Sequence, residues 1–144
     1  MANKLQVELL TAEGHVLSEE ADFVVAPGME GDLGVLPRHI PLLTPLRTGE
    51  IMVRNNGQEQ HFFVAGGFLE VTPDKVVILA DVAERAEDID EAAAEAARKS
   101  AEDALAQDSG DADAAAQLER AIFRLRVAEI RRGHHRDHRG DRAG

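Results

Sequence analysis

Residues 51–63 read Ile-Met-Val-Arg-Asn-Asn-Gly-Gln-Glu-Gln-His-Phe-Phe, and this stretch predicts a β-hairpin. Ile51 and Val53 alternate with longer or polar side chains, the period of two that marks a strand with one buried face. Asn56-Gly57 stands between two strand-like runs. A type I′ turn needs a positive φ at both central positions, which asparagine and glycine adopt most readily. The stretch therefore predicts two antiparallel strands joined by a two-residue turn.

Strand-like runs continue over residues 4 to about 84. The alternation recurs at residues 5–9, and the nearly all-apolar run at residues 76–80 predicts a central strand covered on both faces. Turn signals rich in glycine, proline and asparagine separate the runs, and no helical period is present. Many short strands of this kind predict an antiparallel β-sandwich or flattened barrel in residues 1–87.

The hydrophobic period changes at residue 88. Asp88 and Glu91 have the spacing of a capping box, in which Asp88 accepts from the third amide and Glu91 reaches back. An alanine-rich helix is predicted from there to about Ala106. Its only large apolar residue is Leu105, and each methylene that alanine lacks forfeits about 0.8 kcal/mol of burial. This helix is therefore expected to pack closely but weakly.

A second helix is predicted to begin at Asp111 or Asp113, either of which suits an N-cap, and to end at Gly133. The short break before it favours an antiparallel hairpin over residues 88–133. Residues 134–144 form a basic tail of histidines and arginines, which is predicted to be disordered because it has no large apolar anchor.

The second helix carries two apolar faces and a basic ridge. At 100° per residue the two faces lie on nearly opposite sides. They consist of Leu118, Ala121, Ile122 and Leu125 on one side, and Phe123, Val127 and Ile130 on the other. Arg120, Arg124 and Arg131 cluster within about 40° of one another. One small partner helix does not cover this much surface, so either two alternative docking states or burial in a fixed oligomer is expected.

Charge is divided unevenly along the chain. The net charge is −11, yet residues 117–144 contain eight arginines and four acids and carry +4, so residues 1–116 carry −15. An acidic body with a basic end lacks the broad positive footprint of a nucleic-acid-binding protein. It favours a basic arm that meets an acidic partner. The alternative is a solvated helix end whose arginines suit the macrodipole.

The residue types present argue against an enzyme. The chain has no cysteine, which excludes disulfides, thiolate zinc sites and cysteine nucleophiles. Residues 31–34, Gly-Asp-Leu-Gly, lack the Gly-Lys-Ser/Thr ending of a phosphate loop. The histidines of the tail are expected to bind metal only adventitiously, and His15, His39 and His61 have no acidic partner at a fixed spacing. No catalytic, cofactor or metal site is expected.

No apolar stretch approaches the roughly 18 residues that a membrane-spanning helix needs. The first residues also lack the continuous apolar run of a secretory signal. An intracellular protein is therefore expected.

Four blocks of the sequence resemble those of the epsilon subunits of F-type ATP synthases. The first, residues 31–44, reads GDLGVLPRHIPLLT and resembles the G-[ED]-[LM]-G-x-x-P-x-H-x-P-[LF]-[LV]-[TS] block of that family. The others are residues 65–71, 77–84 and 125–130, in the order in which the family has them. Together the blocks cover residues 3 to about 132.

The resemblance implies a two-part architecture and a role in rotary coupling. It implies an N-terminal antiparallel β-sandwich of about ten strands, which binds the gamma subunit and the c-ring, and a C-terminal antiparallel α-helical hairpin. Asp32 and His39 fall in the loop that faces the ring and gamma in relatives. The implied function is that of a non-catalytic subunit at the cytoplasmic face of the cell membrane, where it couples ion flow to ATP synthesis.

The resemblance also implies a brake on ATP hydrolysis. In the family the hairpin can extend along gamma and place its basic second helix against the beta and alpha subunits. Arg120, Arg124, Arg126 and Arg131 are the corresponding contact residues here. One alternative is a purely structural coupling subunit whose hairpin stays folded and never inhibits. A second alternative is a stand-alone β-sandwich binding module.

A nucleotide motif of the family is incomplete in this chain. Some relatives bind ATP through the pattern I/L-D-x-x-R-A at the start of the first helix, whereas residues 89–94 read Ile-Asp-Glu-Ala-Ala-Ala. Asp90 matches the pattern, but Ala93 stands where the pattern has arginine. An arginine supplies a forked, charge-assisted contact to phosphate that alanine lacks. Poor ATP binding and no cofactor are therefore expected.

Overall fold

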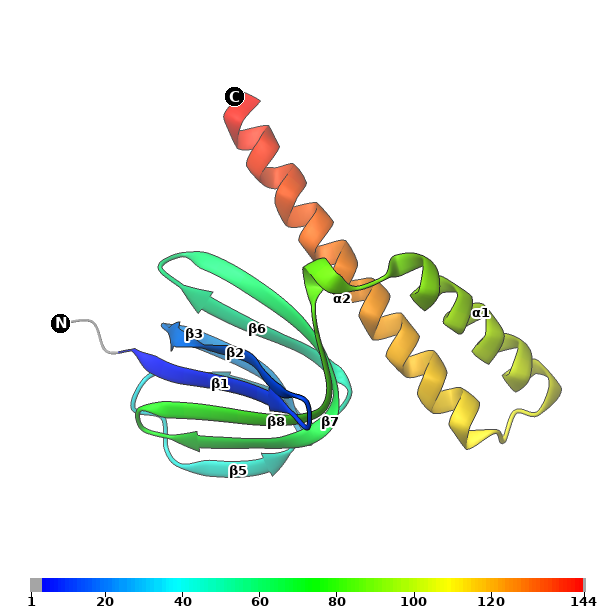
Figure 1. Ribbon diagram of the computed structural model, residues 1–144, viewed down its shortest axis with the longest axis horizontal. Coiled ribbons are helices and arrows are strands. Elements are labelled where there is room, and N and C mark those ends of the chain that lie inside the picture. The colour runs from blue at the N-terminus through cyan, green and yellow to red at the C-terminus, as the bar shows by residue number, and fades with distance from the viewer. Residues whose placement is uncertain (1–3, 144) are drawn as a thin grey trace. The chain divides into compact units, whose positions relative to one another are not determined.

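The computed structural model describes residues 4–143 of the chain, with side chains as far as residue 130. The chain divides into two compact units, Met1–Arg85 and Ala86–Gly144, which Figure 1 shows as a β-sheet structure and a pair of helices. The sequence placed this boundary two residues later, between residues 87 and 88.

Unit 1 has eight strands within residues 4–85, fewer than the ten that the resemblance implied. They are β1 (Leu5–Thr11), β2 (Gly14–Ala21), β3 (Phe23–Gly28), β4 (Gly31–Val35), β5 (Leu42–Pro45), β6 (Gly49–Asn55), β7 (Gln58–Thr72) and β8 (Lys75–Arg85). Two of the strands, β7 and β8, are long, at 15 and 11 residues, and each runs as one continuous strand.

The strands form a single hydrogen-bonded sheet in the order β2-β1-β8-β7-β6-β3-β4, with β5 added along β7. The first part of β7 pairs with β6 and its last part pairs with β5, so β7 passes from one layer of the folded sheet to the other (Figure 1). Its bend lies at Gly66 and Gly67, which have φ values of 73° and 123°. The sandwich is thus an open sheet folded over on itself.

One strand pair departs from the predicted antiparallel arrangement. β1 and β8 run parallel, with Gln6 opposite Lys75 and Leu10 opposite Leu79. Every other pair of strands in the described part of the chain is antiparallel.

The hairpin predicted from residues 51–63 is present. Asn56 and Gly57 form its turn with φ values of 54° and 80°, and β6 and β7 pair on either side. Ile51 and Val53 point into the core, as the period of two predicted. The core of unit 1 also contains the inward residues of β1, namely Leu5, Val7 and Leu9, all fully buried.

Unit 2 begins with a 3₁₀ turn at Ala86–Asp88 and contains α1 (Glu91–Gln107) and α2 (Ala112–Ala143). The cap of α1 is Asp90, not the predicted Asp88: the Ala93 N–H donates to its carboxylate at 3.0 Å. Asp88 ends the 3₁₀ turn instead, so the predicted capping box is wrong. Asp111 caps α2, because its carboxylate accepts from the Ala114 N–H at 3.0 Å. Of the two predicted caps, Asp111 and Asp113, the structure thus has the first.

The packing of the helices relies on small residues, as the sequence predicted. The buried alanines recur every seven residues on each helix, and they are Ala94 and Ala101 on α1 and Ala114, Ala121 and Ala128 on α2. Ile122, which belongs to the first of the two predicted apolar faces of α2, is 39 % exposed. The small residues let the backbones come close but bury little apolar area.

The backbone of α2 continues through Gly133 to Ala143. The predicted end of the helix at Gly133 is therefore wrong: glycine lowers helix propensity by about 1 kcal/mol but does not by itself stop a helix. The side chains of Arg131 and of the predicted tail, residues 134–144, lie outside the described residues.

Candidate functional site

The turn between β3 and β4 presents Asp32. Gly28 pairs with Gly31 across the turn, and Asp32 is the next residue of β4, with an exposed side chain. Arg47 fixes the turn: its Nε donates to the Gly28 carbonyl at 2.6 Å, and its Nη2 lies 3.4 Å from Oδ1 of Asp32. The Arg47 backbone N–H also donates to Pro27 at 2.9 Å. Sequence reasoning missed Arg47, because nothing in its spacing from Asp32 indicates the contact.

A groove of about 430 Å³ lies beside this turn. Its lining comes from the β3–β4 turn and from β5, and consists of Gly28, Met29, Glu30, Gly31, Asp32, Leu33, Leu42, Thr44 and Pro45. β4 lies at one end of the strand order and β5 pairs only with β7, so each leaves one edge without a strand neighbour in the described chain. The groove therefore combines apolar walls, two carboxylates and unpaired strand edges, which suit a protein segment better than a small molecule.

His39 lies in a different place from Asp32. β4 separates the two residues: Asp32 is near its start, and His39 belongs to the loop at residues 36–41 that follows its end. The Nδ1 atom of His39 lies 2.7 Å from the Ile40 carbonyl, and its backbone N–H donates to Leu36 at 3.2 Å. The structure therefore does not join the two residues into one site, and His39 braces its own loop.

The outer face of the β5–β7–β8 layer exposes large apolar side chains. Leu43 is 68 % exposed, and Phe68 and Leu79, which are opposite one another on β7 and β8, are each 54 % exposed. We call Leu43, Phe68 and Leu79 the outer apolar face. The prediction that residues 76–80 are covered on both faces is therefore wrong for Leu79, although Val76 and Ile78 are buried. An apolar run does not by itself distinguish a buried face from a contact face.

The arginines of α2 have different surroundings. Arg120 is exposed, and Arg124 is half-buried and takes part in a polar or charged contact. The guanidinium of Arg126 lies 4.8 Å from the centre of the Phe123 ring, a cation–π contact. The sequence placed the ridge of Arg120, Arg124 and Arg131 beside Phe123, and the cation that the structure places over its ring is Arg126.

The start of α1 does not fit a nucleotide. Asp90 is the helix cap, and its Oδ1 already accepts from Ala93. A hollow of about 540 Å³ nearby is lined by Glu91, Ala92, Glu95, Leu125 and Glu129. Three carboxylates in one hollow oppose a triphosphate, and the guanidinium of Arg98 on the same helix is held by Glu95 and Glu102.

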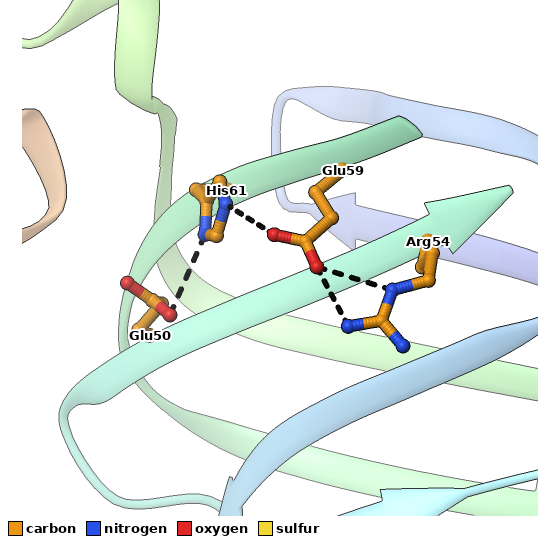
Figure 2. A network of polar contacts seen from close by, with 4 residues as sticks. All are labelled: Glu50, Arg54, Glu59 and His61. Atoms are coloured by element: carbon orange, nitrogen blue, oxygen red, sulfur yellow. Dashed lines mark hydrogen bonds and ion pairs between the residues drawn. The ribbon is translucent and has the colours of Figure 1, made fainter. Parts of the chain in front are cut away.

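His61 lies between two carboxylates, although no acidic partner at a fixed spacing was expected for it. Its Nδ1 is 3.5 Å from Oε1 of Glu50 on β6, and its Nε2 is 3.4 Å from Oε1 of Glu59 on β7 (Figure 2). The other oxygen of Glu59 accepts from Arg54 at 2.6 Å. The hairpin register brings these residues together, because it places Arg54 opposite Glu59 and leaves Glu59 and His61 on one face of β7. Extending the predicted hairpin outward from its turn finds this cluster.

The contact with the Glu50 carboxylate raises the pKa of His61 above its ordinary value, with Glu59 adding to the effect and burial opposing it. A raised folded-state pKa means that the protonated imidazole stabilises the fold. This stability is fully present below the unfolded-state pKa of about 6.5 and is lost as pH rises through the folded-state value.

We expect His61→Gln to remove this pH dependence. Between pH 6 and pH 9, the free energy of unfolding of the unmodified chain should fall relative to that of the variant, as measured by urea denaturation at each pH. Glu50→Gln removes the main cause of the raised His61 pKa, so this variant alone should weaken the pH dependence of the free energy of unfolding. Parallel stability curves for the unmodified chain and His61→Gln would contradict the assignment.

These surfaces define a class of protein. A β-sandwich with an exposed apolar face and a charged turn, followed by a helical hairpin with a basic second helix, is a subunit that works by binding other proteins. Residues 4–86 match the beta-sandwich domain of the ATP synthase delta/epsilon chain, and residues 87–129 match the long alpha-helix domain of the same chain. The chain therefore belongs to the delta/epsilon chain family of ATP synthases, as a non-catalytic, epsilon-type subunit of the central stalk.

Curated relatives agree in sequence and length. The chain is 50 % identical over 135 residues to the ATP synthase epsilon chain of Dehalococcoides mccartyi strain BAV1, covering 91 % of this chain and 96 % of the relative. It is also 50 % identical to the ATP synthase epsilon chain 1 of Methylococcus capsulatus, covering 90 % and 95 %.

A solved structure shares the fold. It belongs to the Euglena gracilis mitochondrial ATP synthase, described as OSCP/F1/c-ring in rotational state 1, with a TM-score of 0.74 at 23 % identity over 89 % of this chain and 82 % of that chain. Neither described helix contains a segment that is apolar enough, over the length needed, to cross a membrane.

Proposed function

We propose that this subunit couples rotation to ion flow by holding gamma with its outer apolar face and meeting the polar loops of the c-ring with the β3–β4 turn. The exposure of Leu43, Phe68 and Leu79 on one sheet face is the observation that carries the proposal. An apolar sheet face in contact with water is a cost that burial against a partner removes.

The β3–β4 turn supports the second contact. Arg47 holds the turn in one conformation, so Asp32 is presented at a fixed place with little loss of conformational freedom on binding. Asp32 contributes position more than affinity, because an exposed charge at the rim of an interface is worth about 1 kcal/mol or less. His39 acts on the same partners through the loop that it braces. The Euglena relative comes from an assembly that includes a c-ring, which agrees with this arrangement.

The hairpin is proposed to act as a brake on ATP hydrolysis. Its alanine-rich contact costs little to open, and the arginines of α2 suit an acidic surface on the beta and alpha subunits. The acidic hollow beside Asp90 opposes ATP binding, so nucleotide does not hold this hairpin folded. The alternative is a permanently folded hairpin in a purely structural subunit.

The proposed location follows from the proposed partners. A subunit that binds gamma and the c-ring lies at the cytoplasmic face of the cell membrane.

Replacing Phe68 with serine should weaken binding to purified gamma. Because the ring is already half-buried, it gains only about 1 kcal/mol from full burial, which corresponds to roughly a fivefold rise in Kd. Calorimetry with the full chain measures the change. Gln58→Ser, at an exposed position at the other end of β7, is the control and should bind like the unmodified chain. Equal affinity of all three proteins would show that gamma binds elsewhere.

A further inference from the structure

The loop between β4 and β5 exposes an apolar, basic and apolar sequence of side chains. Leu36 is 60 % exposed and Ile40 is 79 % exposed, the highest value among the exposed large apolar residues of the described chain. Arg38, also exposed, lies between them in the sequence. We call Leu36, Arg38 and Ile40 the loop tip. Single exposed apolar residues are common in proteins, whereas a loop that exposes two of them around a cation offers a partner both apolar area and a charge.

The backbone of the loop tip is strained at Arg38. This residue has a φ of 67°, in the left-handed region where a side chain meets steric opposition. The conformation is held from outside the residue: the Arg38 N–H donates to the Pro73 carbonyl at 2.6 Å, and the His39 N–H donates to Leu36. A glycine at this position would take the same conformation without strain. Residues held in such conformations cluster at ligand clamps, active sites and switch regions, which makes the strained Arg38 a candidate contact residue.

The charge of Arg38 is not used within unit 1. Residues 1–85 contain 13 acidic and six basic residues, so this cation is carried by an acidic unit. Four of the other five basic side chains are engaged: Lys4 with Asp22, Arg47 with Asp32, Arg54 with Glu59, and Arg85 with Gln60. Among the residues whose side chains the structure describes, Arg38 has no hydrogen-bond or ion-pair partner. An exposed, unpaired cation on an acidic unit is complementary to a carboxylate on another protein.

We propose that Arg38 is the residue by which the loop tip recognises gamma, through a gamma carboxylate flanked by apolar side chains that cover Leu36 and Ile40. This proposal rests on the proposed function and specifies the chemistry of the partner's surface. His39 has the supporting role, because its ring contacts the Ile40 carbonyl and shapes the loop.

Calorimetry of the full chain with purified gamma tests the proposal, using Arg38→Gln, Arg38→Lys and Arg38→Gly. Arg38→Gln keeps the left-handed strain and loses the charge, and its Kd should rise about fivefold in low salt, with the difference shrinking at 1 M salt. Arg38→Lys should retain most of the affinity. Arg38→Gly should bind as weakly as Arg38→Gln while its Tm rises by a few degrees, because the strain is removed together with the contact.

Asn56→Gly is the matched control, because Asn56 also has a positive φ but lies at the turn between β6 and β7. It should bind gamma like the unmodified chain. If Arg38→Gln and Arg38→Gly bind gamma with unchanged affinity, or lose affinity only for the c-ring, the inference is wrong although the proposed function stands. If the unmodified chain does not bind gamma, the proposed function itself fails.

Discussion

Gly67→Ala should unfold unit 1 or leave it barely stable, with a loss of more than about 4 kcal/mol in the free energy of unfolding. A Cβ built at Gly67 lies 2.8 Å from the Ala80 Cα and closer still to the Leu79 carbonyl oxygen. Both obstacles are backbone atoms of the paired strand, so no side chain can move aside. The φ of 123° adds strain of its own. Such a loss approaches the whole stability of a typical domain.

Gly14→Ala separates strain from collision. Gly14 has a φ of 127°, almost the same as that of Gly67, but no atom lies within 4 Å of a Cβ built there. The free energy of unfolding of Gly14→Ala should therefore fall only by the cost of the backbone strain, about 1–3 kcal/mol. Urea denaturation of both variants, followed by circular dichroism, measures the difference. Equal losses would mean that the close approach of β7 and β8 at the bend contributes nothing.

Replacing Arg120, Arg124 and Arg131 together with alanine should raise ATP hydrolysis by the assembled complex about ten- to hundredfold. Exposed ion pairs are worth up to about 1 kcal/mol each, so three of them contribute roughly 1.5–3 kcal/mol to the inhibited state. A single replacement is expected to have a small effect for the same reason. High salt should release the unmodified complex in part, because the Debye length falls to about 3 Å at 1 M.

The triple lysine variant is the control for charge. It keeps the three cations and should keep most of the inhibition, although lysine lacks the forked geometry of arginine. Equal hydrolysis rates for the unmodified, alanine and lysine complexes would eliminate the brake and leave the purely structural subunit. Rates that rise equally in the alanine and lysine variants would assign the inhibition to the shape of the guanidinium group.

Local chemistry was readable from the sequence where one turn or cap decides the outcome. The turn at Asn56-Gly57 and the alternation of Ile51 and Val53 predicted the β6–β7 hairpin, and Asp111 was among the predicted caps. The prediction of Asp88 as the cap of α1 failed, because aspartate at either position suits a cap and the preceding 3₁₀ turn places Asp90 at the helix start.

Features that depend on long-range pairing were not readable from the sequence. The parallel partner of β1 and the Arg47 clamp on the β3–β4 turn both join residues that are far apart in the sequence. Exposure was misjudged for the same reason, since Leu79 belongs to an apolar run whose outer side the sheet leaves uncovered. The strain at Arg38 has no sequence signal in one chain, because arginine is not a residue that typically marks a positive φ.

The parallel pairing of β1 with β8 determines how late in synthesis the sheet of unit 1 can be completed. Leu9 and Ile78, which are neighbours in the finished sheet, are 69 positions apart in the chain, so their pairing requires the closure of a very long loop. During synthesis β1 emerges early, but its neighbour β8 is made only when nearly all of the sandwich has been translated. Pairing over such separations is slow and exposes unpaired strand edges in the meantime. The two helices, which contact one another over short separations, assemble quickly once they have been made, so the slow step in maturation lies in the sandwich.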